Sequence, residues 1–418
     1  MKKALGKPRT GVIAALDVGT TKVCCFIARV DGSGVPRIVG IGHQVSAGVR
    51  NGGIVDMEQA EASIRAAVHA AEKMAGVTVR QVLVNASGGH PASRTLGFEV
   101  PIAGHEIGNG DIRRVLRRGR YLPEPAGREV IHAIPVGFTI DGSRGIRDPR
   151  GMYGARLGVN MHVVTASTGA MRNVTTCVRR CHLNVEALVV APYAAGLAAL
   201  IEDEMDLGVI LIDMGGGTTS LAVFFDGAVV YTDSVPVGGA HVTNDIARML
   251  STPLKHAERI KTLYGHCIAG AVDEQASVEV PPIGEDDPAA ANRVPMATLI
   301  GIVQPRIEEI FELVRGRLGA SGFDDIAGRR AVLTGGASQL PGMRELAAEI
   351  LGKQVRMGRP IRLSGLAEAT GGPAFATCAG LVTFAVQKQP ALAAQDRLAE
   401  EEPGGLFGRL SEWLRETL

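Results

Sequence analysis

The chain has 418 residues, which is long enough for several domains and a substantial buried core. Its 44 basic and 43 acidic residues nearly cancel, which excludes a strong whole-chain attraction to nucleic acid or to an acidic surface. Glycine is abundant at 54 residues, and the glycines stand in short motifs between apolar runs. This pattern favours an α/β protein with tight turns that face phosphate groups.

No segment predicts export or insertion into a membrane. Residues Met1–Thr10 are basic but lack the apolar core of a signal peptide. Nowhere does the chain reach the roughly 18 consecutive apolar residues that a membrane span needs. Any membrane contact is therefore expected to be peripheral.

The first predicted elements are strands around a glycine turn. Apolar runs predict strands at Gly11–Leu16 and Val23–Val30, joined as a hairpin by the sequence DVGTTK. Arg37–Val45 predicts a third strand. Helical periodicity follows over Asp56–Ala75, and Gln81–Asn85 predicts another buried strand.

The texture changes between residues 86 and 162, where glycine and proline are frequent and apolar runs are short. The segment contains one basic helix candidate, Asp111–Arg120, and no phosphate-type motif. It is interpreted as a domain inserted into the first one. Strand texture resumes at Val163–Ser167, and Ala170–Cys181 predicts a helix.

The strand–aspartate–glycine unit then returns. Val209–Asp213 is followed by the turn GGGTT and by a strand at Leu221–Phe225, and Ala331–Leu333 later leads into the turn TGGAS. Such self-similarity indicates an internal duplication.

The remaining segments are mostly helical. Helices are predicted at Ala240–Leu250, Leu254–Leu263 and Thr298–Leu318, and the acidic stretch Asp273–Arg293 is expected to be a surface loop. The polar stretch Gln387–Gly405 predicts a flexible linker.

The last thirteen residues predict an amphipathic helix. Such a helix can pack on its own domain or lie on a membrane surface. The preceding linker and the position of the chain's single tryptophan favour the membrane. The apolar face consists of Leu406, Phe407, Leu410, Trp413, Leu414 and Leu418.

Two aspartates carry the main chemical prediction, because Asp17 and Asp213 each close a strand and precede small residues. The N–H groups of such turns form an anion-binding concavity, threonine hydroxyls add donors, and Lys22 could reach a terminal phosphate. Two carboxylates facing one phosphate chain suit Mg²⁺, with Asp17 and Asp213 as its ligands. An ordinary pair of glycine hairpins is the alternative, and the duplication argues against it. The predicted contacts are Asp17, Gly19, Thr20, Thr21, Lys22, Asp213, Gly215, Gly216, Gly217, Thr218 and Thr219.

The motif order LDVGTTK, LIDMGGGTTSLAVF and AVLTGGASQLPGM resembles the two phosphate loops and the adenosine loop of the actin-like ATPases. The resemblance implies an actin-like fold of two ribonuclease-H-like domains that bind ATP and Mg²⁺. The sequence HAERIK is similar to the adenosine helix of these proteins, which implies that Glu258 and Lys261 contact adenosine. Gly335 and Gly336 would line the adenine side. Taken alone, Glu258 and Lys261 would be read as a solvated helix face.

The inserted segment narrows the resemblance, because HAIPV and DPRGMYGARL within it are similar to the FtsA family of bacterial cell-division proteins. The resemblance covers about residues 11–388 and resumes at 405. It implies an inserted α/β subdomain and a C-terminal amphipathic helix. The first actin-like subdomain would comprise residues 11–85 and 163–205, with the insertion at 86–162. The second would comprise 206–239 and 326–388, with a helical subdomain on the adenosine and FtsZ side at 240–325. The linker would be 389–405 and the membrane-targeting helix 406–418.

The resemblance also implies partners and a location. Members of the family join the C-terminal peptide of FtsZ to the cytoplasmic face of the bacterial inner membrane at the division septum. They also polymerise with themselves and work with downstream division proteins. The sequence QPRIEE resembles the family's partner-binding helix, so Arg306 and Glu309 are candidate peptide contacts. A solvated helix edge explains these two residues equally well.

One departure bears on hydrolysis. Hydrolysing relatives carry a glutamate before the second phosphate loop that orients the attacking water, and here Ala191 stands in its place. The expectation is ATP binding with slow hydrolysis at most.

Two other functions stay open at this point. A sugar or acetate kinase of the same superfamily would carry a phosphoacceptor pocket with a catalytic aspartate and no membrane tail. A pilus-assembly relative would share the nucleotide core and the insertion but recruit a pilus component. The predicted tail and linker favour division over both.

Overall fold

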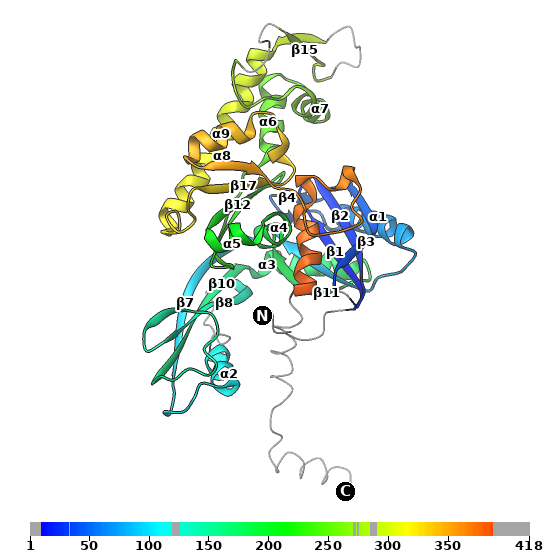
Figure 1. Ribbon diagram of the computed structural model, residues 1–418. Coiled ribbons are helices and arrows are strands. Elements are labelled where there is room, and N and C mark those ends of the chain that lie inside the picture. The colour runs from blue at the N-terminus through cyan, green and yellow to red at the C-terminus, as the bar shows by residue number, and fades with distance from the viewer. Residues whose placement is uncertain are drawn as a thin grey trace.

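The computed structural model describes residues 10–32, 34–118, 126–270, 273, 276–284 and 291–387. In this part of the chain two sheet-centred halves lie side by side, with a third sheet at one end and a helical unit at the other (Figure 1). The predicted linker at 389–405 and the predicted amphipathic helix at 406–418 lie outside the described residues. Among the residues that are described, no helix is long and apolar enough to cross a membrane.

The first half contains a five-stranded sheet in the order β11-β6-β1-β2-β3. The hairpin predicted around the first glycine turn is confirmed, since β1 and β2 pair antiparallel along their whole length. Strand β3 continues antiparallel, and β6 and β11 run parallel. The strands are β1 Gly11–Val18, β2 Lys22–Val30, β3 Pro36–Val45, β6 Gln81–Ala86 and β11 Asn184–Val190.

Helices cover both faces of this sheet because successive side chains of a strand point to opposite sides. In β1, Ala14 and Leu16 pack towards α1 (Met57–Ala75) and α3 (Thr168–Arg180). The alternate residues of β1 pack on the other side, towards α4 (Ala191–Ala199) and a helix over residues 376–387. These two helices approach very closely, because a Cβ at Gly380 would overlap the Ala194 carbonyl.

The second half repeats this plan, with strands in the order β14-β13-β12-β17-β18. Again three strands are antiparallel and two run parallel. The predicted duplication is therefore confirmed. The strands are β12 Val209–Met214, β13 Thr219–Phe225, β14 Ala228–Val235, β17 Arg330–Thr334 and β18 Gln354–Met357. The helices are α5 Glu202–Leu207 and α9 Met343–Leu351, with single 3₁₀ turns at Ala337–Gln339, Glu368–Thr370 and Pro373–Phe375.

The inserted segment forms its own four-stranded sheet in the order β7-β10-β8-β9. One expectation is corrected: Val163–Ser167 is extended, but it is the end of β10 and pairs within this sheet. The ladder simply continues past residue 162, so no new strand of the first half begins there. The elements are β7 Ala92–Pro101, α2 Asn109–Arg118, β8 Arg128–Ile140, β9 Ser143–Ile146 and β10 Arg156–Ser167.

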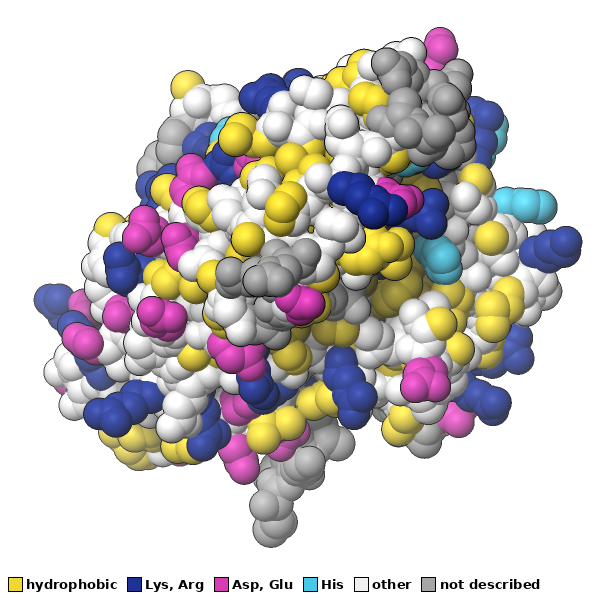
Figure 2. All heavy atoms as spheres, turned by 90° about the horizontal axis from the view of Figure 1, so that it is seen from above, with side chains coloured by type: hydrophobic (Ala, Val, Ile, Leu, Met, Phe, Trp, Pro, Cys, Tyr) yellow, Lys and Arg dark blue, Asp and Glu magenta, His cyan; other side chains and the backbone are white. Residues whose placement is uncertain are grey.

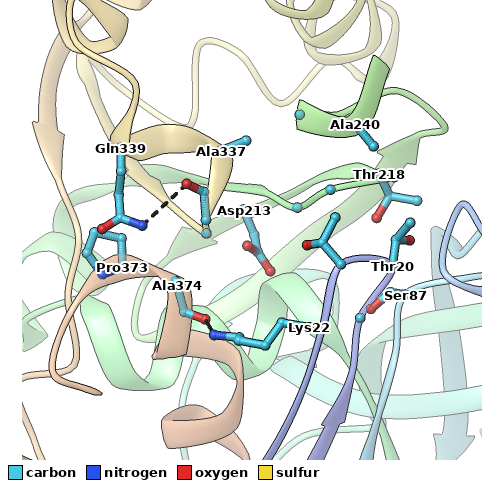
Figure 3. Close-up of a pocket in the computed structure, with 18 of the residues that line it drawn as sticks. Thr20, Lys22, Ser87, Asp213, Thr218, Ala240, Ala337, Gln339, Pro373 and Ala374 are labelled. Atoms are coloured by element: carbon cyan, nitrogen blue, oxygen red, sulfur yellow. Dashed lines mark hydrogen bonds between the residues drawn. The ribbon is translucent and has the colours of Figure 1, made fainter. Parts of the chain in front are cut away.

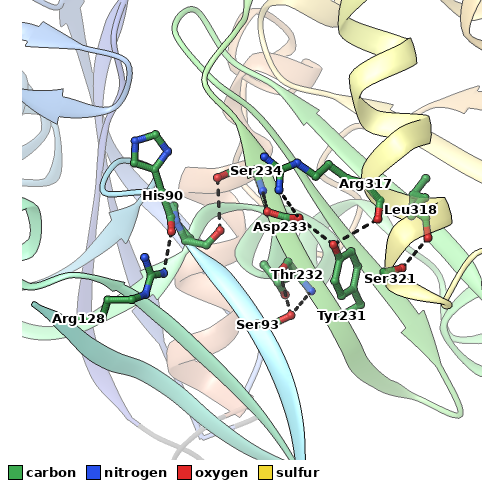
Figure 4. Close-up of polar contacts among 11 residues, drawn as sticks. His90, Ser93, Arg128, Tyr231, Thr232, Asp233, Ser234, Arg317, Leu318 and Ser321 are labelled. Atoms are coloured by element: carbon green, nitrogen blue, oxygen red, sulfur yellow. Dashed lines mark hydrogen bonds and ion pairs between the residues drawn. The ribbon is translucent and has the colours of Figure 1, made fainter. Parts of the chain in front are cut away.

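This inserted sheet emerges from the first half but docks on the second (Figure 4). The Ser93 hydroxyl donates to the Thr232 carbonyl at 2.8 Å and accepts from the Thr232 N–H at 2.7 Å. On the same side, Nε2 of the fully buried His162 lies 3.1 Å from Thr232 Oγ1. At the edge of β14, the backbone N–H and carbonyl of Thr232 are thereby hydrogen-bonded to a side chain of the insertion.

The helical unit lies between β14 and β17 in the chain. It comprises α6 (Gly239–Met249), α7 (Leu254–Tyr264) and α8 (Met296–Ser321). The acidic stretch expected to be a surface loop instead holds strand β15 (Ser277–Val280), which pairs with β16 (Asn292–Pro295). Alternation explains this result, because Val278 and Val280 are buried while the residues between and before them are exposed.

The face of the molecule seen from above carries basic and acidic side chains interspersed (Figure 2). This mixture matches the nearly balanced charge of the chain. No broad field of one sign covers this face, so any electrostatic recognition here is local.

Candidate functional site

A cavity of about 410 Å³ lies between the two halves, where the turns after β1, β12 and β17 meet α6 and α7 (Figure 3). All of the predicted nucleotide contacts except Thr219 line it. They come from segments far apart in the chain, as the duplicated fold requires. The lining residues that the sequence predicts are Asp17, Gly19, Thr20, Thr21, Lys22, Asp213, Gly215, Gly216, Gly217, Thr218, Glu258, Lys261, Gly335 and Gly336.

The two glycine turns have the same backbone geometry. The Gly19 N–H donates to the Lys22 carbonyl at 3.0 Å, and the Gly215 N–H donates to the Thr218 carbonyl at 2.8 Å. In both halves the preceding aspartate pairs with a residue of the next strand in the same register, Asp17 with Cys24 and Asp213 with Ser220. The duplication therefore extends to individual hydrogen bonds.

The turns also touch each other across the cavity. A Cβ built on Gly217 would lie 2.5 Å from Thr20 Oγ1 and 2.8 Å from the backbone of Asn51. The Gly52 N–H donates to the same Thr20 hydroxyl at 3.0 Å. Glycine at 217 is required by this close approach, because any side chain would push the two halves apart.

Both predicted metal ligands are buried carboxylates. Burial raises the pKa of Asp17 to about 7, while the Lys22 ammonium acts in the opposite direction and Asp213 adds to the rise. Burial also raises the pKa of Asp213, against a hydrogen bond from Thr377 and the charge of Lys22. A cation bound between two desolvated carboxylates in one cavity would stabilise their charged forms.

The number of carboxylates limits what the cavity could hold as a metal site. In the described ranges no group of three or more histidine, cysteine or acidic side chains could hold a metal ion. Asp17 and Asp213 alone therefore fit Mg²⁺ only where phosphate oxygens and waters complete its coordination, which is the usual arrangement for this ion.

Lys22 does not extend freely into the cavity. Its Nζ donates to the Ala374 carbonyl and lies 3.5 Å from the centroid of the Phe375 ring. Its charge therefore sits beside both aspartates while the ammonium is fixed by the segment before the 376–387 helix. A phosphate contact requires the ammonium to share or leave this carbonyl.

Thr219 lies behind the second turn. It is fully buried, and its hydroxyl donates to the Val237 carbonyl at 2.8 Å. Because strand β13 begins at Thr219 and alternates its side chains, this residue points away from the side that Thr218 faces. The sequence pattern GGGTT alone does not distinguish the two threonines.

Glu258 and Lys261 meet at one wall of the cavity. Lys261 Nζ lies 2.7 Å from Glu258 Oε2, 2.9 Å from Thr243 Oγ1 and 3.1 Å from the Gly239 carbonyl. The ion pair orients both side chains between α6 and α7. The alternative of a simple solvated helix face therefore does not describe Lys261, whose side chain is only 14% exposed.

Several lining residues were not predicted from the sequence. Thr377 Oγ1 donates to Asp213 Oδ2 at 2.9 Å, and Ala374 holds Lys22. Ser87 lies near Thr20, whereas Gln339 lies at the opposite end of the cavity (Figure 3). Gln339 lies within the quoted motif AVLTGGASQLPGM, and a glycine pair at residues 371–372 precedes Ala374 and Thr377.

The candidate peptide contacts lie on α8, outside this cavity. Arg306 Nε donates to Asp245 Oδ2 at 2.6 Å, and a second nitrogen donates to Asp245 Oδ1 at 3.2 Å. The guanidinium also pairs with Glu309. Arg306 therefore joins α8 to α6 in addition to any role towards a partner.

Two known families match segments of the chain, one in the second half and one in the insertion. Residues 210–380 match the family described as "Cell division protein FtsA". Residues 88–165 match the family described as "SHS2 domain inserted in FTSA", which overlaps the insertion expected at 86–162. The inserted subdomain is thus a known feature of one family.

Solved structures share the fold at low sequence identity. The PilM-PilN type IV pilus biogenesis complex matches with a TM-score of 0.62 and 19% identity, over 90% of this chain and 98% of that chain. MreB5 of Spiroplasma citri bound to ADP matches with a TM-score of 0.56 and 15% identity, over 92% of this chain and 99% of that chain. These likenesses confirm the predicted actin-like fold.

Full-length relatives are considerably closer in sequence. The cell division protein FtsA of Rhizobium meliloti (strain 1021) is 44% identical over 427 residues, which cover 99% of this chain and 97% of that protein. The proteins of the same name from Pseudomonas aeruginosa and Escherichia coli (strain K12) are 36% and 32% identical, over 97% of this chain and 97% and 98% of those proteins. The chain therefore belongs to the FtsA family of cell-division proteins.

Proposed function

We propose that this chain binds ATP with Mg²⁺ between its two halves and tethers FtsZ filaments to the cytoplasmic face of the inner membrane at the septum. The observation that carries the nucleotide part is the pair Asp17 and Asp213. They close equivalent strands in the same register and face one cavity through glycine turns of the same geometry. Membership of the FtsA family supports the role in division.

The polarity of the cavity supports an orientation for the nucleotide. Thr20 and Thr218 lie at one end, where turn N–H groups favour phosphate. The Glu258–Lys261 pair lies in the helical unit, and Gly336 and Gln339 lie in the turn after β17, where adenosine would bind. A cavity of this volume is within the range of about 300–1,000 Å³ that is typical of small-molecule sites.

Asp17 and Asp213 would hold the Mg²⁺ together with phosphate oxygens and waters. The ion supplies charge neutralisation of the phosphates when bound. Removing a cation from beside two buried carboxylates favours their protonation, which is the direction in which burial already shifts both pKa values.

Slow hydrolysis at most is part of the proposal. Ala191 begins α4 and lines the cavity. By the resemblance it stands where hydrolysing relatives carry the carboxylate that orients the attacking water, and a methyl group cannot do this. A steady-state turnover near the enzyme median of about 10 s⁻¹ would contradict this part. ATP would then act mainly as a ligand that changes the conformation and self-assembly of the chain.

The adaptor role needs two further contacts and self-association. The apolar face of residues 406–418 would bind lipid, and Arg306 with Glu309 would contact the FtsZ C-terminal peptide. One short helix binds a membrane weakly and reversibly. Polymerisation would raise retention by multivalency, and downstream division proteins would join the assembled filaments.

The alternatives have less support. The pilus-assembly hypothesis rests on the solved PilM-PilN complex at 19% identity, whereas full-length relatives at 32–44% identity are cell-division proteins. A sugar or acetate kinase does not account for the match of residues 88–165 to the domain inserted in FtsA.

The nucleotide part is tested by calorimetric titration of MgATP into the wild-type chain and an Asp213→Asn variant. We expect at least tenfold weaker binding by the variant, because a charged ligand contact contributes about 1.5–3 kcal/mol. Asp203→Asn, an exposed position on α5, is the control with the same change of charge. Equal affinities of all three proteins would refute the assignment.

The membrane part is tested by liposome co-sedimentation of the full chain and a truncation that ends at Pro403, with and without MgATP. We expect only the full chain to pellet with lipid. If both proteins stay in the supernatant, residues 406–418 are not a membrane anchor and the tethering role fails, whatever the nucleotide titration shows.

A further inference from the structure

A second cavity of about 200 Å³ opens beyond the phosphate end of the first one. Thr20 and Ala240 line both cavities, so the two spaces meet there. In Figure 3 these two residues lie at the end opposite Gln339. The second cavity is bounded by the β4–β5 hairpin (Val49–Arg50 and Gly53–Ile54) on one half and by α6 and α8 on the other.

The lining of the second cavity has an excess of positive charge. The single carboxylate in this lining, that of Asp245, already forms a bidentate ion pair with Arg306. Arg50 and Arg248 also line it, and neither has an ion-pair partner in the part of the chain that the structure describes. These two arginines come from opposite halves, the first from the hairpin and the second from α6.

Uncharged groups around the arginines also present donors. Nδ1 of His241 accepts the Gly238 N–H at 3.2 Å, so the neutral ring carries its proton on Nε2. The Thr20 hydroxyl accepts the Gly52 N–H, which leaves its own proton to donate. The amide groups of Asn51 and Asn244 line the same space.

We propose that this cavity is a second anion site, which binds orthophosphate beside a bound nucleotide. Unpaired arginines exclude a cation, and the polar lining excludes an apolar ligand. A phosphate ion offers only charged oxygen acceptors, which match arginine forks and neutral N–H and O–H donors. The inference rests on the proposed function for its placement beside the phosphate end.

Phosphate bound here would bridge the two halves, because Arg50 and Arg248 belong to different ones. It would therefore favour the arrangement in which the hairpin and α6 are close together. The terminal phosphate of ATP offers the same chemistry as free phosphate. Our proposal commits to the free ion, and the experiment separates the two sources.

The test is a calorimetric titration of inorganic phosphate into the full chain saturated with MgADP. We expect binding by the wild type and roughly tenfold or greater weakening in Arg248→Ala and in Arg50→Ala, as one charged hydrogen-bonding partner is lost. Arg248→Lys, which keeps the charge and loses the fork, should fall between. Arg172→Ala, an exposed arginine on α3, is the matched control and should leave phosphate affinity unchanged.

Affinities for MgADP and MgATP are measured for the same variants, and we expect neither to change. Weaker MgATP binding with unchanged phosphate binding would assign the arginines to the nucleotide's own terminal phosphate and overturn the second site. Competition between phosphate and MgADP, or phosphate binding that is indifferent to both arginines, would also overturn it. If the wild type binds no nucleotide at all, the proposed function fails, while the effect of Arg248→Ala on phosphate binding still decides this inference.

Discussion

The two halves of the molecule share a framework and differ in what is attached to it. Each contains a five-stranded sheet in the same order, with an aspartate at the end of the same strand and an identical turn hydrogen bond. The first half carries its large insertion after β6, and the β4–β5 hairpin and α1 after β3. The second half carries α6–α8 after β14. The helical unit therefore forms one wall of the cavity, whereas the hairpin of the first half contributes only Gly52 to its lining.

A second difference concerns the two aspartates. Asp213 accepts a hydrogen bond from Thr377, whereas no side-chain hydrogen bond to the Asp17 carboxylate is found among the described residues. The duplication thus reproduces the backbone, but the Asp17 carboxylate lacks the side-chain hydrogen bond that the Asp213 carboxylate accepts. Asp17 is therefore the more useful position at which to test how much a bound ligand stabilises a buried carboxylate.

The largest expected effect is on the stability of the ligand-free protein when Asp17 is replaced by asparagine. The pKa of Asp17 is about 7 in the folded state, against an ordinary value of 3.8 for an aspartate side chain. Between these values the folded state binds more protons than the unfolded state, so the wild type loses stability as the pH rises from about 4 to about 7, and the loss is complete above 7. Asp17→Asn removes this loss. We expect a higher free energy of unfolding above pH 7, by on the order of 2–4 kcal/mol, measured by denaturant titration.

The same variant should bind MgATP more weakly, which separates the stability of the site from its function. Asp213→Asn should show a smaller gain in stability, because the hydrogen bond from Thr377, which Asp17 lacks, already favours the charged form of Asp213. If wild type and Asp17→Asn lose stability in parallel between pH 4 and 8, Asp17 is not the group that titrates.

A smaller effect is expected where the two halves touch. Gly217→Ala would place a methyl group against Thr20 and the Asn51 backbone, so the turns must separate. We expect a cost of about 1–3 kcal/mol in unfolding free energy and weaker nucleotide binding.

Gly336→Ala is the matched control for the stability part of this prediction, since its Cβ would meet nothing nearer than Ala374 Cβ at 3.8 Å. Thermal unfolding of the two variants should differ clearly. Equal losses would mean that the close approach of the turns is not what position 217 requires.

The smallest expected effect separates the adjacent threonines of the second turn. Thr219→Val loses a buried hydrogen bond to Val237 and should cost about 1 kcal/mol of stability, with little change in nucleotide affinity. Thr218→Val should do the reverse, because Thr218 lines the cavity. Paired unfolding and nucleotide titrations check both, and a loss of nucleotide affinity confined to Thr219→Val would contradict this placement.

Sequence reasoning located the parts of the site that are encoded locally. An aspartate, a glycine turn and a following strand leave a readable pattern, so Asp17, Asp213 and the turns between strands were predicted. Thr377 was not, because its partner Asp213 lies far away in the chain and one threonine in a helix carries no pattern. Thr219 was misplaced for a related reason: which of two adjacent threonines faces a cavity depends on where the strand begins.

The strand pair β15–β16 shows a similar limit. Its alternating valines are two residues in an acidic, proline-bearing stretch, and the composition obscured them. The end of β10 was assigned to the wrong sheet because a strand pattern does not reveal its partner. Local patterns therefore predicted most elements, while pairings across the chain required the structure.

The helix over residues 376–387 has a mechanical consequence. At Gly380 it has no space even for a methyl group against α4, so it can neither rotate nor slide independently of that helix. Its first turn contacts Asp213 through Thr377, and Ala374, two residues before the helix, accepts a hydrogen bond from Lys22. The N-terminal end of this helix is therefore bonded to both carboxylate-bearing turns, through Thr377 and Ala374. A force applied to the chain at residue 387 would be transmitted along the helix to the cavity.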